Sequence, residues 1–198
     1  MNADFPAMKA SYLKDSVAAL SGFGPEKEAA VRALVPEGLL EQIQAATKVD
    51  WLPIDLDVHF TDALYRVLGE QGLRKLACDA MVRSTQGPLT GPFVRGTIKL
   101  FGLSPKHLLK LSKQFWRAVY RNCGRIEPVD VGLGTLDLHF HDLPEIVARS
   151  RAYLIGFLGG IDGVLVLTKA QEGEVALAPG PQSPGLVTIR VRWSAGKP

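Results

Sequence analysis

The sequence predicts an α+β protein, with N-terminal helices packed on a small C-terminal antiparallel sheet. Apolar residues recur at helical spacing through residues 5–123, and β-like runs occupy residues 124–194. The ending follows the order strand, strand, helix, strand, strand. With 198 residues and 46% hydrophobic content, the chain is long enough for a sizeable core, so a single domain over 1–198 is expected.

Glycine and proline divide the N-terminal region into short helices. The breakers Gly22-Phe-Gly-Pro25 and Pro36-Glu-Gly38 predict helices near 26–34 and 37–48. Trp51-Leu-Pro-Ile54 interrupts this pattern, because Pro53 biases the preceding residue away from helical geometry. Asp57 or Thr61 is expected to cap the next helix, which Gly69 to Gly72 interrupt. A loop is predicted from Gly87 to Pro92.

The C-terminal region alternates strands with one long helix. Four strands are predicted, at Arg125–Val131, Thr135–His141, Glu174–Ala178 and Leu186–Trp193. Between them, residues 145–169 are predicted to form a helix, although 164–167 alone would pass for a strand. Gly156, Gly160 and Gly163 would share one helical face and permit close packing on the sheet, which favours the helix.

Charge is distributed unevenly along the chain. The formal net charge is only +3, but no carboxylate occurs between Asp79 and Glu127. That window contains nine cations: Arg83, Arg95, Lys99, Lys106, Lys110, Lys113, Arg117, Arg121 and Arg125. The remainder of the chain is therefore net acidic, and an asymmetry of this kind bears on binding partners rather than on fold.

The centre of this window is a predicted amphipathic helix from Pro105 to Arg121. Ser104-Pro105 is a typical start, and Asn122-Cys-Gly124 is a typical stop. Five cations fall within an arc of roughly 80° on this helix. We call them the basic ridge: Lys106, Lys110, Lys113, Arg117 and Arg121. Like charges at these spacings repel, so compensation is expected from an external anion or from Glu26, Glu28 and Glu37.

Several partners are compatible with the basic ridge. An acidic protein or a small anionic ligand is expected first, and an anionic membrane surface is an alternative if Trp116 and Tyr120 insert beside the cations. Nucleic acid is not expected, because no zinc finger, RNP-like strand or GXXG loop accompanies the charge. A homodimer is left open.

Signs of catalysis are weak. No GxSxG elbow, Walker loop or GxGxxG occurs, so the protein is not expected to be an enzyme. Asp137, His139 and His141 alternate along one strand and therefore share a face, which makes them candidates for a metal site or simply for the exposed face of a hairpin. A metal-dependent enzyme built on these residues is a second alternative function.

Cysteine usage and hydropathy predict a cytoplasmic protein. Cys78 and Cys123 lack CxxC spacing and are expected to be reduced, with Cys78 buried as a small residue on the apolar side of its helix. No stretch approaches the roughly 20 apolar residues of a membrane span, and the first twenty residues do not resemble a secretory signal or a transit peptide.

The order of elements resembles a known fold. Helices lead through Asn122-Cys-Gly124-Arg125 into a hairpin, a glycine-containing helix and two closing strands that end in Val191-Arg-Trp193. This order is similar to that of vinyl-reductase-like ligand-binding domains, haem-NO-binding domains and the acyl-binding subunits of TRAPP complexes. Trp51-Leu-Pro-Ile54 and the final Arg-Trp more narrowly resemble a myxobacterial paralogous family of unknown function.

The resemblance implies a sensory or adaptor domain that encloses a small apolar ligand, and the basic ridge is expected to dock an acidic partner on it. Haem-NO-binding domains carry a proximal His and a Tyr-x-Ser-x-Arg motif; the motif is absent here, so no cofactor is expected. The closing strands also lack the cysteines that vinyl-reductase-like domains carry there. The TRAPP subunits hold an acyl chain in an apolar tunnel, and the corresponding pocket residues expected here are Cys78, Met81, Phe115 and Trp116.

Overall fold

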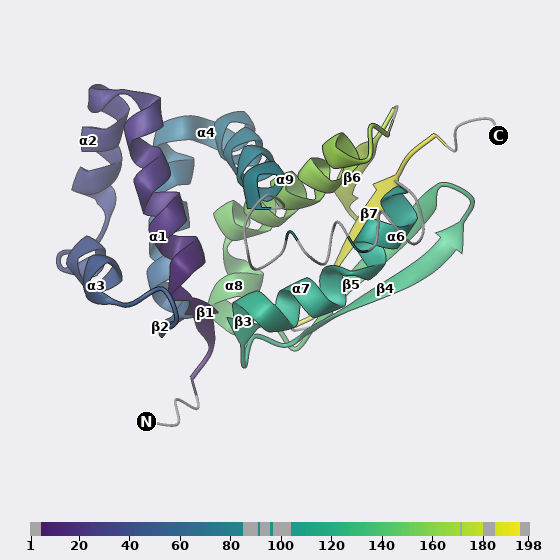
Figure 1. Ribbon diagram of the computed structural model, residues 1–198, viewed down its shortest axis with the longest axis horizontal. Coiled ribbons are helices and arrows are strands. Elements are labelled where there is room, and N and C mark those ends of the chain that lie inside the picture. The colour runs from purple at the N-terminus through teal and green to yellow at the C-terminus, as the bar shows by residue number, and fades with distance from the viewer. Residues whose placement is uncertain are drawn as a thin grey trace.

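The computed structural model describes residues 5–84, 91, 96, 104–170, 172–179 and 185–194. Helices dominate the first half and an antiparallel sheet the second, as predicted (Figure 1). The N-terminal elements are β1 (Ala7–Lys9), α1 (Ala10–Ala18), a 3-10 helix (Ala19–Phe23), α2 (Pro25–Leu34), α3 (Leu39–Ala45), β2 (Trp51–Pro53) and α4 (Ile54–Ser84). The later elements are α6 (Pro105–Lys110), α7 (Ser112–Val119), β3 (Tyr120–Arg121), β4 (Arg125–Gly132), β5 (Thr135–His141), α8 (Glu145–Arg149), α9 (Arg151–Leu167), β6 (Glu174–Leu177) and β7 (Val187–Arg192).

The four predicted strands form one antiparallel sheet in the order β4-β5-β7-β6. Leu138 of β5 lies opposite Ile189 of β7, and both are buried. Because side chains alternate across a strand, one face of the sheet is apolar and packs on α7 and α9, while the other carries polar residues such as Arg190. The α+β fold class is confirmed.

A second, smaller sheet was not predicted. It has the order β2-β1-β3 and joins segments that are far apart in sequence, with Met8 opposite both Leu52 and Tyr120. Its strands have only two or three residues, which is too short for an alternating pattern to emerge. This sheet brings Tyr120 close to the N-terminal helices.

The helix α4 differs from prediction at its start and in its interior. It begins at Ile54, so neither Asp57 nor Thr61 caps it. Only Gly69 interrupts it, with a φ of 68° that produces a kink, and the helix resumes before Gly72. Position 91 is the only residue of the predicted loop from Gly87 to Pro92 that lies among the described residues.

The helix predicted for 145–169 is divided at Ser150 into α8 and α9, and α9 continues through 164–167 as predicted. The hydroxyl of Ser150 accepts a hydrogen bond from the Tyr153 backbone N–H at 3.1 Å and so caps α9. Its hydroxyl also donates to Asp62 of α4 at 2.9 Å. Figure 1 shows α9 crossing beside α4.

The prediction of a single helix from Pro105 to Arg121 is wrong in two places. At Leu111 the backbone N–H bonds to Leu108 O, three residues back, and this tight turn separates α6 from α7. The chain then becomes extended at Tyr120, so Arg121 lies in β3 rather than on a helix. Pairing with β1 overrides the local helical pattern here.

Two apolar clusters form the interior. One lies among α1 to α4, and the other joins the sheet to α6, α7 and the inner side of α9. Both α4 and α9 contribute to each cluster, so these helices connect the two halves. In the described part of the chain, no helix is long and apolar enough to cross a membrane.

A candidate ligand cavity between the helices and the sheet

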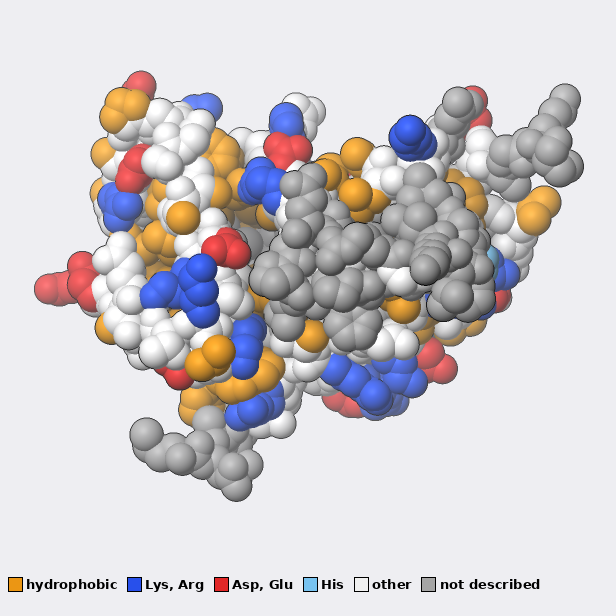
Figure 2. Space-filling model, viewed as in Figure 1, with side chains coloured by type: hydrophobic (Ala, Val, Ile, Leu, Met, Phe, Trp, Pro, Cys, Tyr) orange, Lys and Arg blue, Asp and Glu red, His pale blue; other side chains and the backbone are white. Residues whose placement is uncertain are grey.

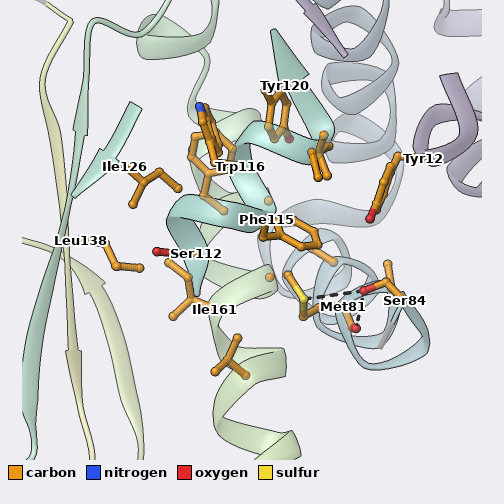
Figure 3. A pocket seen from close by; sticks show the side chains of 18 of the residues that line it. Tyr12, Met81, Ser84, Ser112, Phe115, Trp116, Tyr120, Ile126, Leu138 and Ile161 are labelled. Atoms are coloured by element: carbon orange, nitrogen blue, oxygen red, sulfur yellow. Dashed lines mark hydrogen bonds between the residues drawn. The ribbon is translucent and has the colours of Figure 1, made fainter. Parts of the chain in front are cut away.

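A cavity of about 310 Å³ lies where α4, α6, α7 and α9 meet the apolar face of the sheet. Figure 3 shows its wall: Phe115 and Trp116 enter from α7, Met81 and Ser84 from α4, and Leu138 from the sheet. Tyr12 of α1 faces Phe115 across a ring-to-ring distance of 5.9 Å. A volume of this size is within the usual range for small-molecule sites.

Aromatic rings form one continuous part of the wall. Trp116 stacks on Tyr120 with ring centres 4.1 Å apart and meets Phe140 and Phe157 edge-on at 5.5 Å. Phe157 also contacts Tyr153 at 5.1 Å. Trp116 is fixed further, because its indole N–H donates to Gly124 O at 3.2 Å. These contacts give the cavity a rigid apolar lining.

The open side of α9 borders the cavity. Gly156 and Gly160 both line it, and a Cβ added at Gly156 would meet nothing within 4 Å. Gly159 and Gly163 instead pack against α4, where an added Cβ at Gly163 would lie 2.7 Å from Met81 Cβ. The expectation that Gly156, Gly160 and Gly163 permit packing on the sheet is therefore wrong, since Gly163 packs against a helix and the other two line the cavity.

One end of the cavity is polar. The Tyr153 hydroxyl donates to the Asp57 carboxyl at 2.5 Å, and the Tyr120 hydroxyl lies 3.3 Å from that of Tyr153. Burial raises the pKa of Asp57 to about 6, although the hydrogen bond from Tyr153 acts in the opposite direction. Burial and the Asp57 charge raise the pKa values of both tyrosines, so both remain phenols near neutral pH.

Sequence reasoning missed the role of Asp57, which was expected to cap a helix. The sequence did indicate that Asp57 lies on the buried side of its helix, since Asp57, Phe60 and Leu64 occur at i, i+3 and i+7 and so share one face. Phe60 and Leu64 are buried, and the same helical face carries Asp57, which is only 7% exposed. A carboxylate on an apolar helical face was thus the informative observation.

Ser112 adds a second polar point to the wall. Its hydroxyl oxygen is buried and has no hydrogen-bond partner among the described residues. Figure 3 shows this side chain directed toward the side of Leu138 and Ile161. A buried hydroxyl of this kind is costly unless something satisfies it, and a ligand in the cavity would be in position to do so.

Three of the four expected pocket residues line the cavity: Met81, Phe115 and Trp116. Cys78 does not, because α4 turns it toward a separate surface hollow shared with Arg74 and Asp162. It is half-buried rather than enclosed in the core. Burial and the nearby carboxylates raise its pKa, so it stays a neutral thiol.

The basic ridge is divided by the break at Leu111 and by β3. Lys106 and Lys110 both bind Asp130 of β4, at 3.3 and 2.9 Å, and Arg121 lies 4.4 Å from the centre of the Trp51 ring. In Figure 2, Lys and Arg side chains gather with acidic ones along the lower edge, where α7 lies in Figure 1.

The positive charge of the basic ridge is therefore partly compensated within the chain, but the expected residues do not supply the compensation. Asp130 supplies it rather than Glu26, Glu28 and Glu37; Glu28, for example, pairs with Arg32 of its own helix at 2.7 Å. Lys113 and Arg117 are exposed, and neither forms an ion pair with any residue that the structure describes.

The candidate metal residues on β5 are engaged otherwise. Both carboxylate oxygens of Asp137 accept hydrogen bonds from Arg190 of β7, at 2.8 and 2.7 Å. The His141 ring lies 3.1 Å from Glu127, and His139 stacks beside it. No group of three His, Cys, Asp or Glu able to hold a metal occurs within the described ranges.

Comparison with solved structures identifies the architecture. An oxygen-binding H-NOX domain related to soluble guanylate cyclases superposes with a TM-score of 0.62 at 12% identity, over 94% of this chain and 95% of that one. An Fe(II) unliganded H-NOX protein from K. algicida gives 0.64 at 12%, over 96% and 98%. The I5F mutant of T. tengcongensis H-NOX also gives 0.64 at 12%, over 94% and 98%.

The chain has the H-NOX fold. The expected haem-NO-binding architecture is thus confirmed, whereas the narrower myxobacterial resemblance stays a prediction. No protein-family model and no curated protein sequence matches the chain. At identities this low, the shared H-NOX fold describes architecture and not chemistry.

Proposed function

We propose that this chain is a non-enzymatic sensory domain that binds a small apolar ligand in the cavity and signals to an acidic protein partner through α7. The observation that carries the proposal is the apolar cavity beside α7. Its aromatic walls and the unsatisfied Ser112 hydroxyl support ligand binding. Among H-NOX domains of the same fold, one is an oxygen complex and another is an Fe(II) protein, which supports a sensory, ligand-binding role for this chain.

The helix α7 supports a connection between ligand and partner. Its inner face places Phe115, Trp116 and Val119 on the cavity wall, and its outer face exposes Lys113 and Arg117. A ligand that shifts the wall would therefore move these two cations, for which no ion-pair partner occurs among the described residues. Charge of this kind contributes to the rate and specificity of association.

Haem does not fit the described cavity. All four histidines of the chain are described, and none of them lines the cavity. Of the three lining tyrosines, Tyr120 and Tyr153 are held with Asp57, and their raised pKa values disfavour the phenolate that iron would require. No Lys or Arg occurs among the described lining residues to pair with haem propionates. The proposed ligand is therefore not haem.

Mass spectrometry tests this function most directly. The purified chain should show a non-covalent mass increment under native conditions that disappears under denaturing conditions. Gly156→Leu should abolish it, because the new side chain would occupy the open space, whereas Gly156→Ala should retain it. Haemin titration should give no Soret shift. Absence of any bound mass, together with no thermal stabilisation by apolar compounds, would contradict the proposal.

The alternative functions receive less support. Trp116, one of the two residues needed to insert into a membrane, is only 4% exposed. A metal-dependent enzyme on β5 would need Asp137 to exchange its two hydrogen bonds with Arg190 for a metal. Neither alternative explains the cavity.

A further inference from the structure

We infer that the ligand is an apolar amine whose ammonium group binds the Asp57 carboxylate at the polar end of the cavity. This inference rests on the proposed function and specifies its ligand class. Asp57 lines the cavity and is only 7% exposed. It accepts a hydrogen bond from the Tyr153 phenol, and it forms no ion pair with any Lys, Arg or His that the structure describes. A buried carboxylate without a cation is unfavourable, and an ammonium group would supply the missing charge.

The polarity of the wall favours a cation over an anion. Asp57 is the only charged residue among the described lining residues. Other polar groups there are hydroxyls and an amide, such as Tyr12, Thr61 and Ser112. A carboxylate or phosphate ligand would meet no positive side chain among them and would be repelled by Asp57. Fatty acids are therefore expected to bind poorly.

Aromatic rings beside the carboxyl strengthen the same preference. Tyr153 and Tyr120 carry the hydroxyls next to Asp57, and the Trp116 ring stacks on Tyr120 at 4.1 Å. All three line the cavity. Ring faces attract cations, most strongly when water is excluded, so a carboxylate bordered by tyrosine and tryptophan suits an ammonium group. The apolar remainder of the wall, around Phe157 and Ile161, would hold the hydrocarbon part.

The test uses three probes that differ only in their head group: octylamine, octanol and octanoate. Near pH 7 the first is a cation and the third an anion. Titration calorimetry on the full chain should show octylamine binding at least about tenfold more tightly than either of the others. Asp57→Asn should reduce octylamine affinity to that of octanol and leave octanol unchanged. Gly156→Leu should abolish binding of all three.

A pH titration of the unaltered protein gives an independent measurement. Tyr120, Tyr153 and Cys123 surround Asp57, and burial raises the pKa of each. Only Asp57 in this group, with its pKa of about 6, should therefore change charge between about pH 5 and 8. Octylamine affinity should fall as the pH drops below about 6, and octanol affinity should not.

The outcomes separate this inference from the proposed function. The amine assignment would be overturned if octanoate bound as tightly as octylamine. It would also be overturned if neither Asp57→Asn nor pH altered the ratio of octylamine affinity to octanol affinity. Either result would still leave a ligand cavity. Failure of all three probes to bind would overturn both. A selective amine response in both experiments would establish the ligand class.

Discussion

One face of α9 uses the same residue type for opposite purposes at its two edges. Gly159 and Gly163 bring the helix so close to α4 that added side-chain atoms would collide with it. Gly156, three residues before Gly159, faces open space in the cavity, and Gly160 is nearly as open, with Met81 Cε 3.8 Å from an added Cβ. The glycines on one side stabilise contact between helices, and those on the other create volume for a ligand.

Gly159→Ala should produce the largest effect on the packed side. A Cβ there would overlap the Arg74 carbonyl oxygen and lie 2.9 Å from Ala77 Cβ, so α4 and α9 would have to separate. We expect a loss of about 3 kcal/mol or more in the free energy of unfolding. Urea denaturation followed by circular dichroism would measure it.

Gly156→Ala is the matched control for that measurement, since it makes the same chemical change on the open side. With nothing within 4 Å of the added methyl, stability should stay the same or rise by up to about 1 kcal/mol. Equal destabilisation by the two variants would show that the packed and open sides do not differ.

Asp57→Asn probes the polar end of the open side. Because the pKa of Asp57 is about 6 in the folded state and 3.8 is the ordinary pKa of an aspartate, the folded state binds the proton more tightly. Stability from this group is therefore complete below about pH 4 and is lost as the pH rises through about 6, a change of about 3 kcal/mol. The Asn variant should lack this loss.

The comparison must be made as a difference between variant and parent. Other groups titrate in the opposite direction: Arg190 lowers the pKa of Asp137, and Lys110 lowers that of Asp130, so both contribute stability that is lost in acid. Unfolding free energies measured at several pH values for both proteins would cancel these contributions. A difference that does not change with pH would contradict the raised pKa of Asp57.

How far the sequence predicted the fold depended on the length of each element. The four strands of the large sheet and the passage of α9 through 164–167 were predictable because their patterns extend over several residues. The three strands of the small sheet were not, because β1, β2 and β3 depend on long-range pairing. The same pairing extends the chain at Tyr120, which local helical spacing gave no means to foresee.

The candidate site was predictable only in its apolar part. Met81, Phe115 and Trp116 were expected from the resemblance to ligand-binding domains, and they do line the cavity. The partnership of Asp57 with Tyr153 joins residues 96 positions apart, so only the orientation of Asp57 was accessible, and not its partner. Likewise, Cys78 and Met81 belong to one helix, and only its crossing with α9 determines which of them reaches the cavity.

Gly156→Leu extends the comparison from stability to binding. The side chain would occupy volume that is apolar and open, so we expect a change of no more than about 1 kcal/mol in unfolding free energy, in the stabilising direction. Binding of apolar ligands should nevertheless be lost. Calorimetric titration of octanol into parent and variant would show it, with Gly156→Ala as the control that retains binding. Retained binding in the Leu variant would place the ligand elsewhere.

The smallest effect on stability is expected at the outer face of α7, beyond the cavity wall. Lys113→Glu combined with Arg117→Glu should change unfolding free energy by no more than about 0.5 kcal/mol, because neither side chain has an ion-pair partner among the described residues. Binding of an acidic probe such as poly-glutamate at low salt should be lost, since exposed charges dominate such association and salt screens them.

Lys106→Glu combined with Lys110→Glu makes the same change in net charge and serves as the matched control. Here two new carboxylates would face Asp130, so stability should fall slightly, while poly-glutamate binding through Lys113 and Arg117 is largely retained. Fluorescence anisotropy would compare probe affinity across the two double variants. If both lost the probe equally, binding would follow net charge alone, and the distinction between the compensated and uncompensated halves of the basic ridge would have no functional meaning.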